Sequence, residues 1–292
     1  MLHRSRAALV VAHPGHEMCV YGWLESARPR VFVLTDGSGR AGQSRLLATT
    51  KLLGELGLEP GSIFGRFTDR AIYSAVMAQD NGLFLGLARE LASAFVREKI
   101  EAVVGDASEG YNSTHDLCRA LINAAVSIAQ RASGQQIANY DFPVVGQPSA
   151  YSIPPQTNAL WLRLEESVFQ RKLTAVQRYY PELLAEMEAA LDRIGPGPWR
   201  TYLELTAQEE AEWMKHRLDA FRVECLRPVL SSEQSRELTD EFKEKPPFYE
   251  LHGEAQVAAG HYDQVIRYRE HIRPIAVMLR QVSRECSRGH AA

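Results

Sequence analysis

The chain lacks any paired spacing among its cysteines. Its four cysteines, Cys19, Cys118, Cys225 and Cys286, are scattered without a C-x-x-C or C-x-x-x-C pattern. This excludes a zinc ribbon and argues against a disulfide framework, which is mostly a feature of small secreted domains. Long apolar runs are missing too. The run at residues 7–12 is shorter than the roughly 7–15 residues of a signal-peptide core, and no stretch approaches the roughly 18 residues of a membrane span. We therefore expect a cytoplasmic protein that does not enter a membrane.

Neither sign of charge dominates the sequence. The chain has 33 basic and 36 acidic residues, a formal net charge of −3 and a pI near 6.3. It therefore lacks the basic footprint of a nucleic-acid binder, and we expect no nucleic-acid partner. The glycine-rich G-x-G-x-x-G turn of dinucleotide-binding proteins is absent as well, because the first apolar run is followed by His-Pro-Gly-His at residues 13–16. A nicotinamide or S-adenosylmethionine site is not expected there.

What is present is an alternation of strands and helices through the first half of the chain. Apolar runs at residues 7–12 and 30–35 are rich in β-branched side chains, as expected of strands buried on both faces. Shorter candidate strands lie at residues 62–67 and 102–105. Candidate helices lie at residues 17–26, 44–56, 81–99 and about 114–133, the last capped by Ser113 or Thr114. This order predicts a Rossmann-like α/β fold over residues 1–160, with a mainly parallel sheet and helices on both faces.

The second half of the chain, residues 161–292, has mostly helical patterns. Residues 134–158 are rich in Gln, Pro, Tyr and Asn and are predicted to form a crossover, and residues 159–164 are a further candidate strand. Helices are predicted at residues 166–194, 207–222, 233–241 and 262–284. We therefore expect a helical C-terminal extension to follow the α/β domain.

Three histidines follow two of the predicted strands. His13 and His16 come after the first strand, and His115 comes after the strand at residues 102–105. Because parallel sheets bind ligands beyond the carboxyl ends of their strands, the three imidazoles are expected to converge. Three protein ligands with one open position is the arrangement of catalytic zinc sites. His115 also falls near a helix N-terminus, which favours the neutral imidazole that binds metal. Each histidine alone is equally compatible with a structural hydrogen-bonding role.

The segments around these histidines resemble a known set of motifs. AHPGHE at residues 12–17, TDG at residues 35–37 and NSTH at residues 112–115 are similar to the A-H-P-D-D-E, T-D-G and H-P-D-H motifs of the PIG-L/LmbE-like metal-dependent N-deacetylases. The resemblance covers roughly residues 7–135. It implies a Rossmann-like fold, a divalent metal that is usually Zn²⁺, and removal of an N-acetyl group from an amino sugar or related amide. By position, it implies that His13 and His115 are metal ligands and that His16 replaces an aspartate ligand.

The chain departs from these motifs at the positions that carry proton transfer. Gly15 stands where the family has its general base, and Thr114 where it has an orienting aspartate. Asn112 replaces the histidine that supports the oxyanion, a role that an amide side chain can also fill.

A relocated carboxylate would have to replace the missing base. Glu17, Asp36 and Asp116 are the nearest by sequence. For each of them a structural role is the alternative: Glu17 as the orienting partner of a histidine ligand, Asp36 as a loop anchor, and Asp116 as an acidic residue in a first helical turn.

Five further residues are candidates for holding a substrate. Arg45 and Asp69 follow strand ends and can bind a polar group, although each could equally anchor a loop. Tyr111 precedes the NSTH segment and is expected beside the metal or as loop filling. His252 and His261 lie in a polar aromatic stretch at residues 248–271. That stretch could line a substrate pocket, form the interface of a homo-oligomer, or simply pack the helices.

Together these patterns predict a metal-dependent amide hydrolase. The expected activity is N-deacetylation of a small polar substrate such as a sugar conjugate, with His13, His16 and His115 holding the metal. Two alternatives stay open. One is a diverged family member that binds a metal or ligand without hydrolysis, which Gly15 and Asn112 favour. The other is a nucleotide-sugar-binding transferase that uses the same sheet edge without metal.

Overall fold

A seven-stranded sheet forms the centre of the protein. The computed structural model describes residues 6–39, 42–145, 159–181, 222–229 and 246–285. The strands run in the order β3-β2-β1-β4-β5-β7-β6 across the sheet. Their bounds are β1 (Ala7–Val11), β2 (Arg30–Thr35), β3 (Pro60–Phe67), β4 (Ala102–Asp106), β5 (Ala138–Phe142), β6 (Leu160–Arg163) and β7 (Val223–Pro228).

Most of this sheet is parallel, as the alternation of strands and helices predicts. β1 lies in the middle and pairs in parallel with both β2 and β4, while β3 and β5 extend the parallel part on either side. β7 pairs antiparallel with β5 and with the edge strand β6. From β1 the chain adds β2 and β3 on one side, and then crosses over to add β4 and β5 on the other side of β1. This is the switch point at which open α/β sheets bind their ligands.

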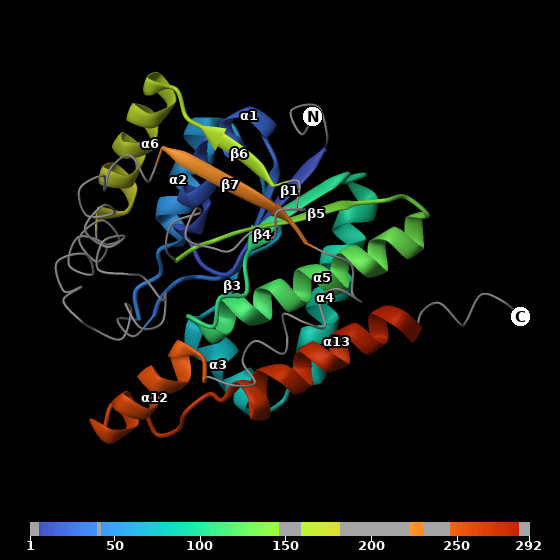
Figure 1. The fold of residues 1–292 in the computed structure, drawn as a ribbon, viewed down its shortest axis with the longest axis vertical. Helices are drawn as coiled ribbons and strands as arrows, with labels where there is room; N and C mark the ends of the chain where they lie inside the picture. Colours follow the sequence, from blue (N-terminus) through green and yellow to red (C-terminus); the bar gives the residue numbers. More distant parts are fainter. Residues whose placement is uncertain (1–5, 40–41, 146–158, 182–221, 230–245, 286–292) are drawn as a thin grey trace, which may run out of the picture.

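Helices cover both faces of the sheet (Figure 1). One face carries α1 (Tyr21–Ala27), α2 (Leu46–Leu56) and α6 (Glu166–Tyr179). The other carries α3 (Asp69–Met77), α4 (Asn81–Arg97), α5 (Ser113–Ser133) and, packed on α5 and α4, α13 (Arg273–Glu285). A short 3₁₀ helix, η2 (His16–Val20), follows β1, and a π-helical turn, η5 (Tyr268–Ile272), precedes α13. α12 (Phe248–Ala258) comes before η5 in the chain and contributes Tyr249 to the hydrophobic core. The Rossmann-like α/β fold with C-terminal helices is confirmed.

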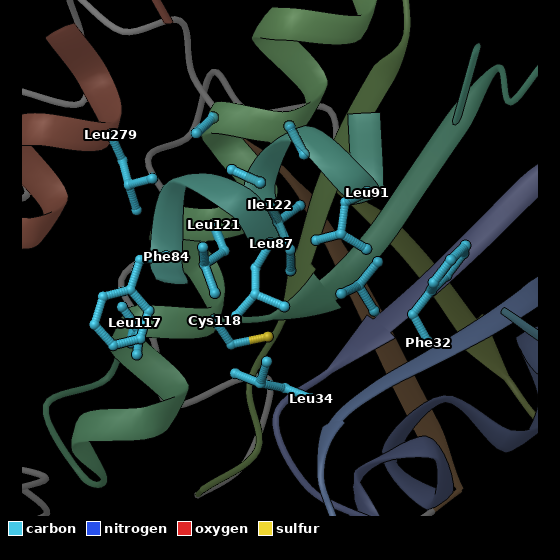
Figure 2. Packing of buried hydrophobic residues seen from close by; sticks show 14 of the residues in the cluster. Phe32, Leu34, Phe84, Leu87, Leu91, Leu117, Cys118, Leu121, Ile122 and Leu279 are labelled. Carbon is cyan, nitrogen blue, oxygen red and sulfur yellow. The ribbon is translucent and has the colours of Figure 1, made fainter. Parts of the chain in front are cut away.

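The alternation of side chains along β1 divides the core into two layers. Ala8 and Val10 face α4, α5 and α13, whereas Leu9 and Val11 face α1 and α2. Figure 2 shows the first layer, in which leucines and phenylalanines of α4 and α5 meet Phe32 and Leu34 of β2, and Leu279 reaches in from α13. Because α13 contributes fully buried side chains to this layer, the C-terminal helix is part of the core of the sheet domain.

Several elements differ from the sequence prediction. β5, α3 and β7 were not predicted, and β7 brings a strand from the second half of the chain into the sheet. The cap of α5 is Asn112, whose Oδ1 accepts from the Thr114 amide at 2.8 Å, and not Ser113 or Thr114, which lie within the helix. The predicted helix from residue 166 ends at Tyr179 as α6 in the described part. The predicted helices at 207–222 and 233–241 fall on residues that lie almost wholly outside the described ranges. The division at residue 160 stays a prediction.

Close approach of β4 to its neighbours requires a glycine at residue 105. A Cβ built there would stand 2.4 Å from the Val10 carbonyl oxygen and 2.5 Å from Ile122 Cδ1. Since a backbone atom cannot move aside cheaply, we expect Gly105→Ala to lower the free energy of unfolding by about 3 kcal/mol. Urea unfolding followed by circular dichroism measures it. Gly86→Ala is the control. Gly86 is exposed in α4 and an added Cβ would have no atom within 4 Å, so this substitution should raise the free energy of unfolding by about 0.5–1 kcal/mol. Equal effects of the two changes would contradict this account.

No helix among the described residues is both long and apolar enough to cross a membrane.

Candidate metal centre

The three histidines lie together at the switch point of the sheet. His13 follows β1, His16 begins η2, and His115 lies in the first turn of α5, directly after the loop that leaves β4. The ring centroids are 5.3 Å apart for His13 and His16, 5.2 Å for His13 and His115, and 4.5 Å for His16 and His115. The structure therefore brings together three imidazoles from two strand ends, as the topology of a parallel sheet requires.

Two neighbours hold the Nδ1 side of His13. Nδ1 lies 2.7 Å from Thr35 Oγ1 and 3.0 Å from Asp69 Oδ1. Thr35 donates its hydroxyl proton to the Ala12 carbonyl, so it accepts from His13. The proton of His13 therefore sits on Nδ1, and Nε2 carries the lone pair. That Nε2 is buried and has no hydrogen-bond partner among the described residues.

Asp106, the last residue of β4, holds His16 in a similar way. Its Oδ2 accepts from the Ala12 amide at 2.7 Å and from His16 Nδ1 at 2.9 Å. The Asp106 side chain is fully buried, and that of His16 is 12% exposed. One carboxylate thus ties the turn after β1 to the end of β4. It also fixes the His16 proton on Nδ1, leaving Nε2 as the potential donor atom.

Burial keeps the inner histidines neutral. Desolvation lowers the pKa of His13, against the opposing hydrogen bond to Asp69. Desolvation, followed by the neighbouring His16 and His13, lowers the pKa of His115 well below its usual value. Burial alone would raise the pKa of Asp69, but its hydrogen bonds, above all that with His13, bring it below the usual range. Neutral imidazoles beside ionised carboxylates are the protonation states that a metal site needs.

The donor set suits a divalent metal, although the rings do not converge on one point. His13 Nε2 and His115 Nδ1 are both buried without a hydrogen-bond partner in the described part of the chain. Within those same residues, no group of three or more His, Cys, Asp or Glu side chains is arranged to hold a metal ion as it stands. The fit is therefore one of residue type, burial and unused nitrogen atoms.

Glu17 is held by hydrogen bonds to other residues of the chain. It is fully buried, its Oε2 accepts from the Gly15 amide at 2.8 Å, and its Oε1 accepts from the Tyr180 hydroxyl. Tyr180 lies one residue beyond α6 and also bonds Thr49 of α2 at 2.8 Å. Both oxygens of Glu17 are thus engaged, which favours a role in holding the turn between His13 and His16.

The other predicted polar residues mainly organise loops. Asp36 Oδ1 accepts from the Ser38 amide at 3.0 Å. Asp116 Oδ1 accepts from the amides of Glu109 and Gly110, and burial raises the pKa of Asp116 to about 6. Asn112, besides capping α5, donates from Nδ2 to the Tyr73 hydroxyl over a long 3.5 Å.

The predicted substrate residues lie at different distances from the histidines. Arg45 is half-buried, donates from Nε to the Gly37 carbonyl, and its charge contributes to the low pKa of His115. Asp69 is engaged by His13 and by the Gly39 amide at 2.6 Å. The Tyr111 ring lies 6.0 Å from His115.

The two C-terminal histidines are exposed on or beside α12. The His252 ring stacks on Phe248 at 5.9 Å, and His261 Nδ1 lies 2.9 Å from Gln256 Oε1. His261, which follows α12, is therefore held by a residue of that helix.

Three residues of the centre were not singled out from the sequence. Asp106 and Thr35 each end a strand with a polar side chain, and this signal could have marked them as partners of the histidines. Tyr180 carries no such signal, because it approaches Glu17 from 163 residues away along the chain.

No known family profile matches the chain, and no curated protein sequence matches it. Among solved structures it is similar to the zinc-inhibited form of teicoplanin deacetylase Orf2, at 15% identity over 78% of this chain and 100% of the other, with a TM-score of 0.46. It is also similar to the A40926 pseudoaglycone deacetylase Dbv21, at 19% identity over 78% and 98% of the two chains, again with a TM-score of 0.46. At these identities and TM-scores, the likeness carries no argument about activity.

Proposed function

We propose that this chain is a metal-dependent amide hydrolase. The activity proposed is N-deacetylation of an amino-sugar-containing or comparable polar metabolite, with His13, His16 and His115 as ligands of a divalent metal, Zn²⁺ in the first instance. The observation that supports it most directly is the grouping of three imidazoles at the switch point, with carboxylates holding Nδ1 of two of them. The motif resemblance to the PIG-L/LmbE-like deacetylases points to the same chemistry.

In this proposal each residue of the site has a separate role. A bound divalent cation supplies Lewis-acid polarisation of the acyl oxygen and lowers the pKa of a nearby water. Thr35 accepts the Nδ1 proton of His13 with Asp69 Oδ1 3.0 Å from the same nitrogen, and Asp106 accepts that of His16, which keeps both Nε2 atoms available. The long bond from Asn112 to Tyr73 is weak enough for an acyl oxygen to compete for that donor. Arg45 adds a positive charge beside His115 for a polar substrate.

The proton acceptor is the least constrained part of this mechanism. Gly15 has no acceptor, and Glu17 would have to release Tyr180 or the Gly15 amide to act as one. Asp36 and Asp116 hold loop amides through one oxygen each. A relocated base among these three carboxylates stays a prediction, as do the cytoplasmic location and a homo-oligomer.

Asp106→Asn tests whether that carboxylate positions a metal ligand. An asparagine keeps the shape and can still accept from the Ala12 amide, but it does not fix the His16 proton on Nδ1 in the same way. We expect metal affinity to fall about 10–100-fold, the usual effect of losing such a partner. Competition with a chromogenic chelator measures it. Asp80→Asn, at the N-cap of α4, is the matched control and should leave the affinity unchanged. Unchanged affinity in Asp106→Asn would show that the bond to His16 is only structural.

The proposed function is tested by metal analysis and by acetate release. The purified chain, loaded with Zn²⁺ and desalted, should retain about one metal per chain by mass spectrometry, as expected of a single site. It should also release acetate from at least one member of a panel of N-acetyl sugars and N-acetyl amides. A chain that holds no metal on titration would end the hydrolase proposal.

A second function is favoured by one specific feature. The position of the family base is glycine, and the adjacent Glu17 has both oxygens engaged. Loss of a general base typically slows a reaction about 10²–10⁴-fold. A chain that binds metal but leaves the whole panel unhydrolysed would therefore be a metal- or ligand-binding protein built on this fold.

A further inference from the structure

A series of aromatic rings leads from the three histidines to the surface. Tyr111, in the loop before α5, has its ring centroid 6.0 Å from that of His115. Phe248, the first residue of α12, stacks on Tyr111 at 5.4 Å with an interplanar angle of 16°. His252 stacks on Phe248 at 5.9 Å and 24°, and Tyr262 meets His252 edge-on at 6.4 Å. We call Tyr111, Phe248, His252 and Tyr262 the aromatic series.

The outer members of the aromatic series do not serve to attach α12. The buried residues of this helix are Tyr249, Glu250 and Gly253. Tyr249 belongs to the main hydrophobic cluster, and its amide donates to the Gly110 carbonyl at 3.4 Å. Glu250 Oε1 accepts from the Tyr268 amide at 2.6 Å. Because this face already fixes the helix, stacking of His252 on Phe248 is not needed to dock α12.

The outer end of the series is open to solvent, while its inner end is not. His252 is exposed and Tyr262 is 39% exposed, whereas Tyr111 and Phe248 are half-buried and His115 is buried. Rings with polar edges thus extend outward from the proposed reaction centre.

We propose that His252 and Tyr262 form a subsite for a second ring of the substrate, with Phe248 holding the His252 ring in place. The ligand is an amide whose leaving part carries a ring with a flat apolar face, either another pyranose or an aryl group. Such a face gains stabilisation by stacking on aromatic side chains, while the hydroxyl and imidazole edges accept or donate to polar substituents. This inference rests on the proposed function for the orientation of the substrate, with its amide at the histidines.

The test uses analogues that the chain cannot turn over. Three ligands carry an N-methylsulfonyl glucosamine unit: its methyl glycoside, its phenyl glycoside, and a disaccharide of two such units joined by a β-1,4 bond. Binding of each ligand to the full chain is measured by calorimetry. We expect the ligands with a second ring to bind about tenfold more tightly than the methyl glycoside, the size of stacking one ring. A gain for the phenyl glycoside alone assigns the subsite to aryl groups, and a gain for the disaccharide alone assigns it to sugars.

Variants of the chain show which side chains cause the tighter binding of the ligands with a second ring. His252→Ala and Tyr262→Ala should remove it and leave binding of the methyl glycoside unchanged. Leu251→Ala is the control, because Leu251 is an exposed apolar residue of the same helix but carries no ring; it should keep the gain. Equal binding of all three ligands by the wild type, or a gain that survives both ring variants or is lost equally in Leu251→Ala, overturns the proposal. Acetate release from methyl N-acetylglucosaminide, measured separately, reports on the proposed function alone.

Discussion

Replacement of His115 by alanine is expected to abolish binding of the proposed metal and, with it, the proposed hydrolysis of amides. His115 contributes a buried Nδ1 that has no partner among the described residues. Loss of an orienting neighbour already costs about 10–100-fold in metal affinity or activity, and loss of a ligand should exceed that range. We expect kcat/KM for acetate release to fall by more than about 100-fold. Metal content after desalting and initial rates of acetate release are the measurements, and His13→Ala should behave alike.

A histidine outside the centre provides the control for this experiment. His271 accepts the Arg267 amide through Nδ1 and lies in the π-helical turn before α13. His271→Ala should retain the metal content of the wild type, whatever its effect on the melting temperature. If His115→Ala keeps both a full complement of metal and its activity, the three imidazoles are not the metal centre. If metal is lost but activity persists, the reaction does not pass through this site.

Lys172→Met is expected to lower the free energy of unfolding by about 3–5 kcal/mol, because it leaves a buried carboxylate without its counter-charge. Lys172 of α6 is 3% exposed, and its Nζ lies 3.0 Å from Glu224 Oε1 on β7. Glu224 also accepts from the amides of Gly22 and Trp23 at the start of α1. These interactions join α1, α6 and β7, so the variant tests how firmly the second half of the chain belongs to the sheet domain. Urea unfolding followed by circular dichroism gives the value.

Two further variants separate burial from charge in this prediction. In the double variant Lys172→Met with Glu224→Gln, both charges are gone, and we expect a smaller loss than the sum of the single changes. Arg178 lies on the same helix as Lys172, and Arg178→Met breaks an exposed ion pair with Glu55 of α2. This change should lower the free energy of unfolding by less than about 1 kcal/mol. Equal losses in Lys172→Met and Arg178→Met would mean that the buried pair contributes no more than a surface pair does.

The elements predicted correctly share a local signal. β1 and β2 are continuous apolar runs, because strands covered on both faces must be apolar on both sides. α4 and α5 have helical spacing of apolar side chains over four turns or more. β7 escaped prediction because its sequence, VECLRP, carries the buried Glu224 and resembles an exposed segment. Its place in the sheet depends on Lys172 and on two backbone amides elsewhere in the chain, and no local pattern reports these.

The same limit applies to the candidate site. His13, His16 and His115 could be assigned to one sheet edge from sequence, because the order of strands dictates where their carboxyl ends lie. The engagement of Glu17 by Tyr180 and the pairing of His16 with Asp106 depend on distances between segments far apart in the chain. The stacking of Phe248 on Tyr111 likewise depends on how α12 packs against a loop far away in the chain.

By itself, the sequence determined the α/β fold and the sheet edge at which three histidines gather, since apolar periodicity and strand order are local or topological properties. Only the tertiary structure decided which groups those histidines contact, which carboxylates are already engaged, and how far the C-terminal helices enter the core. These depend on burial and on hydrogen bonds across long sequence separations, and a buried polar group shows its partner only when the chain is folded.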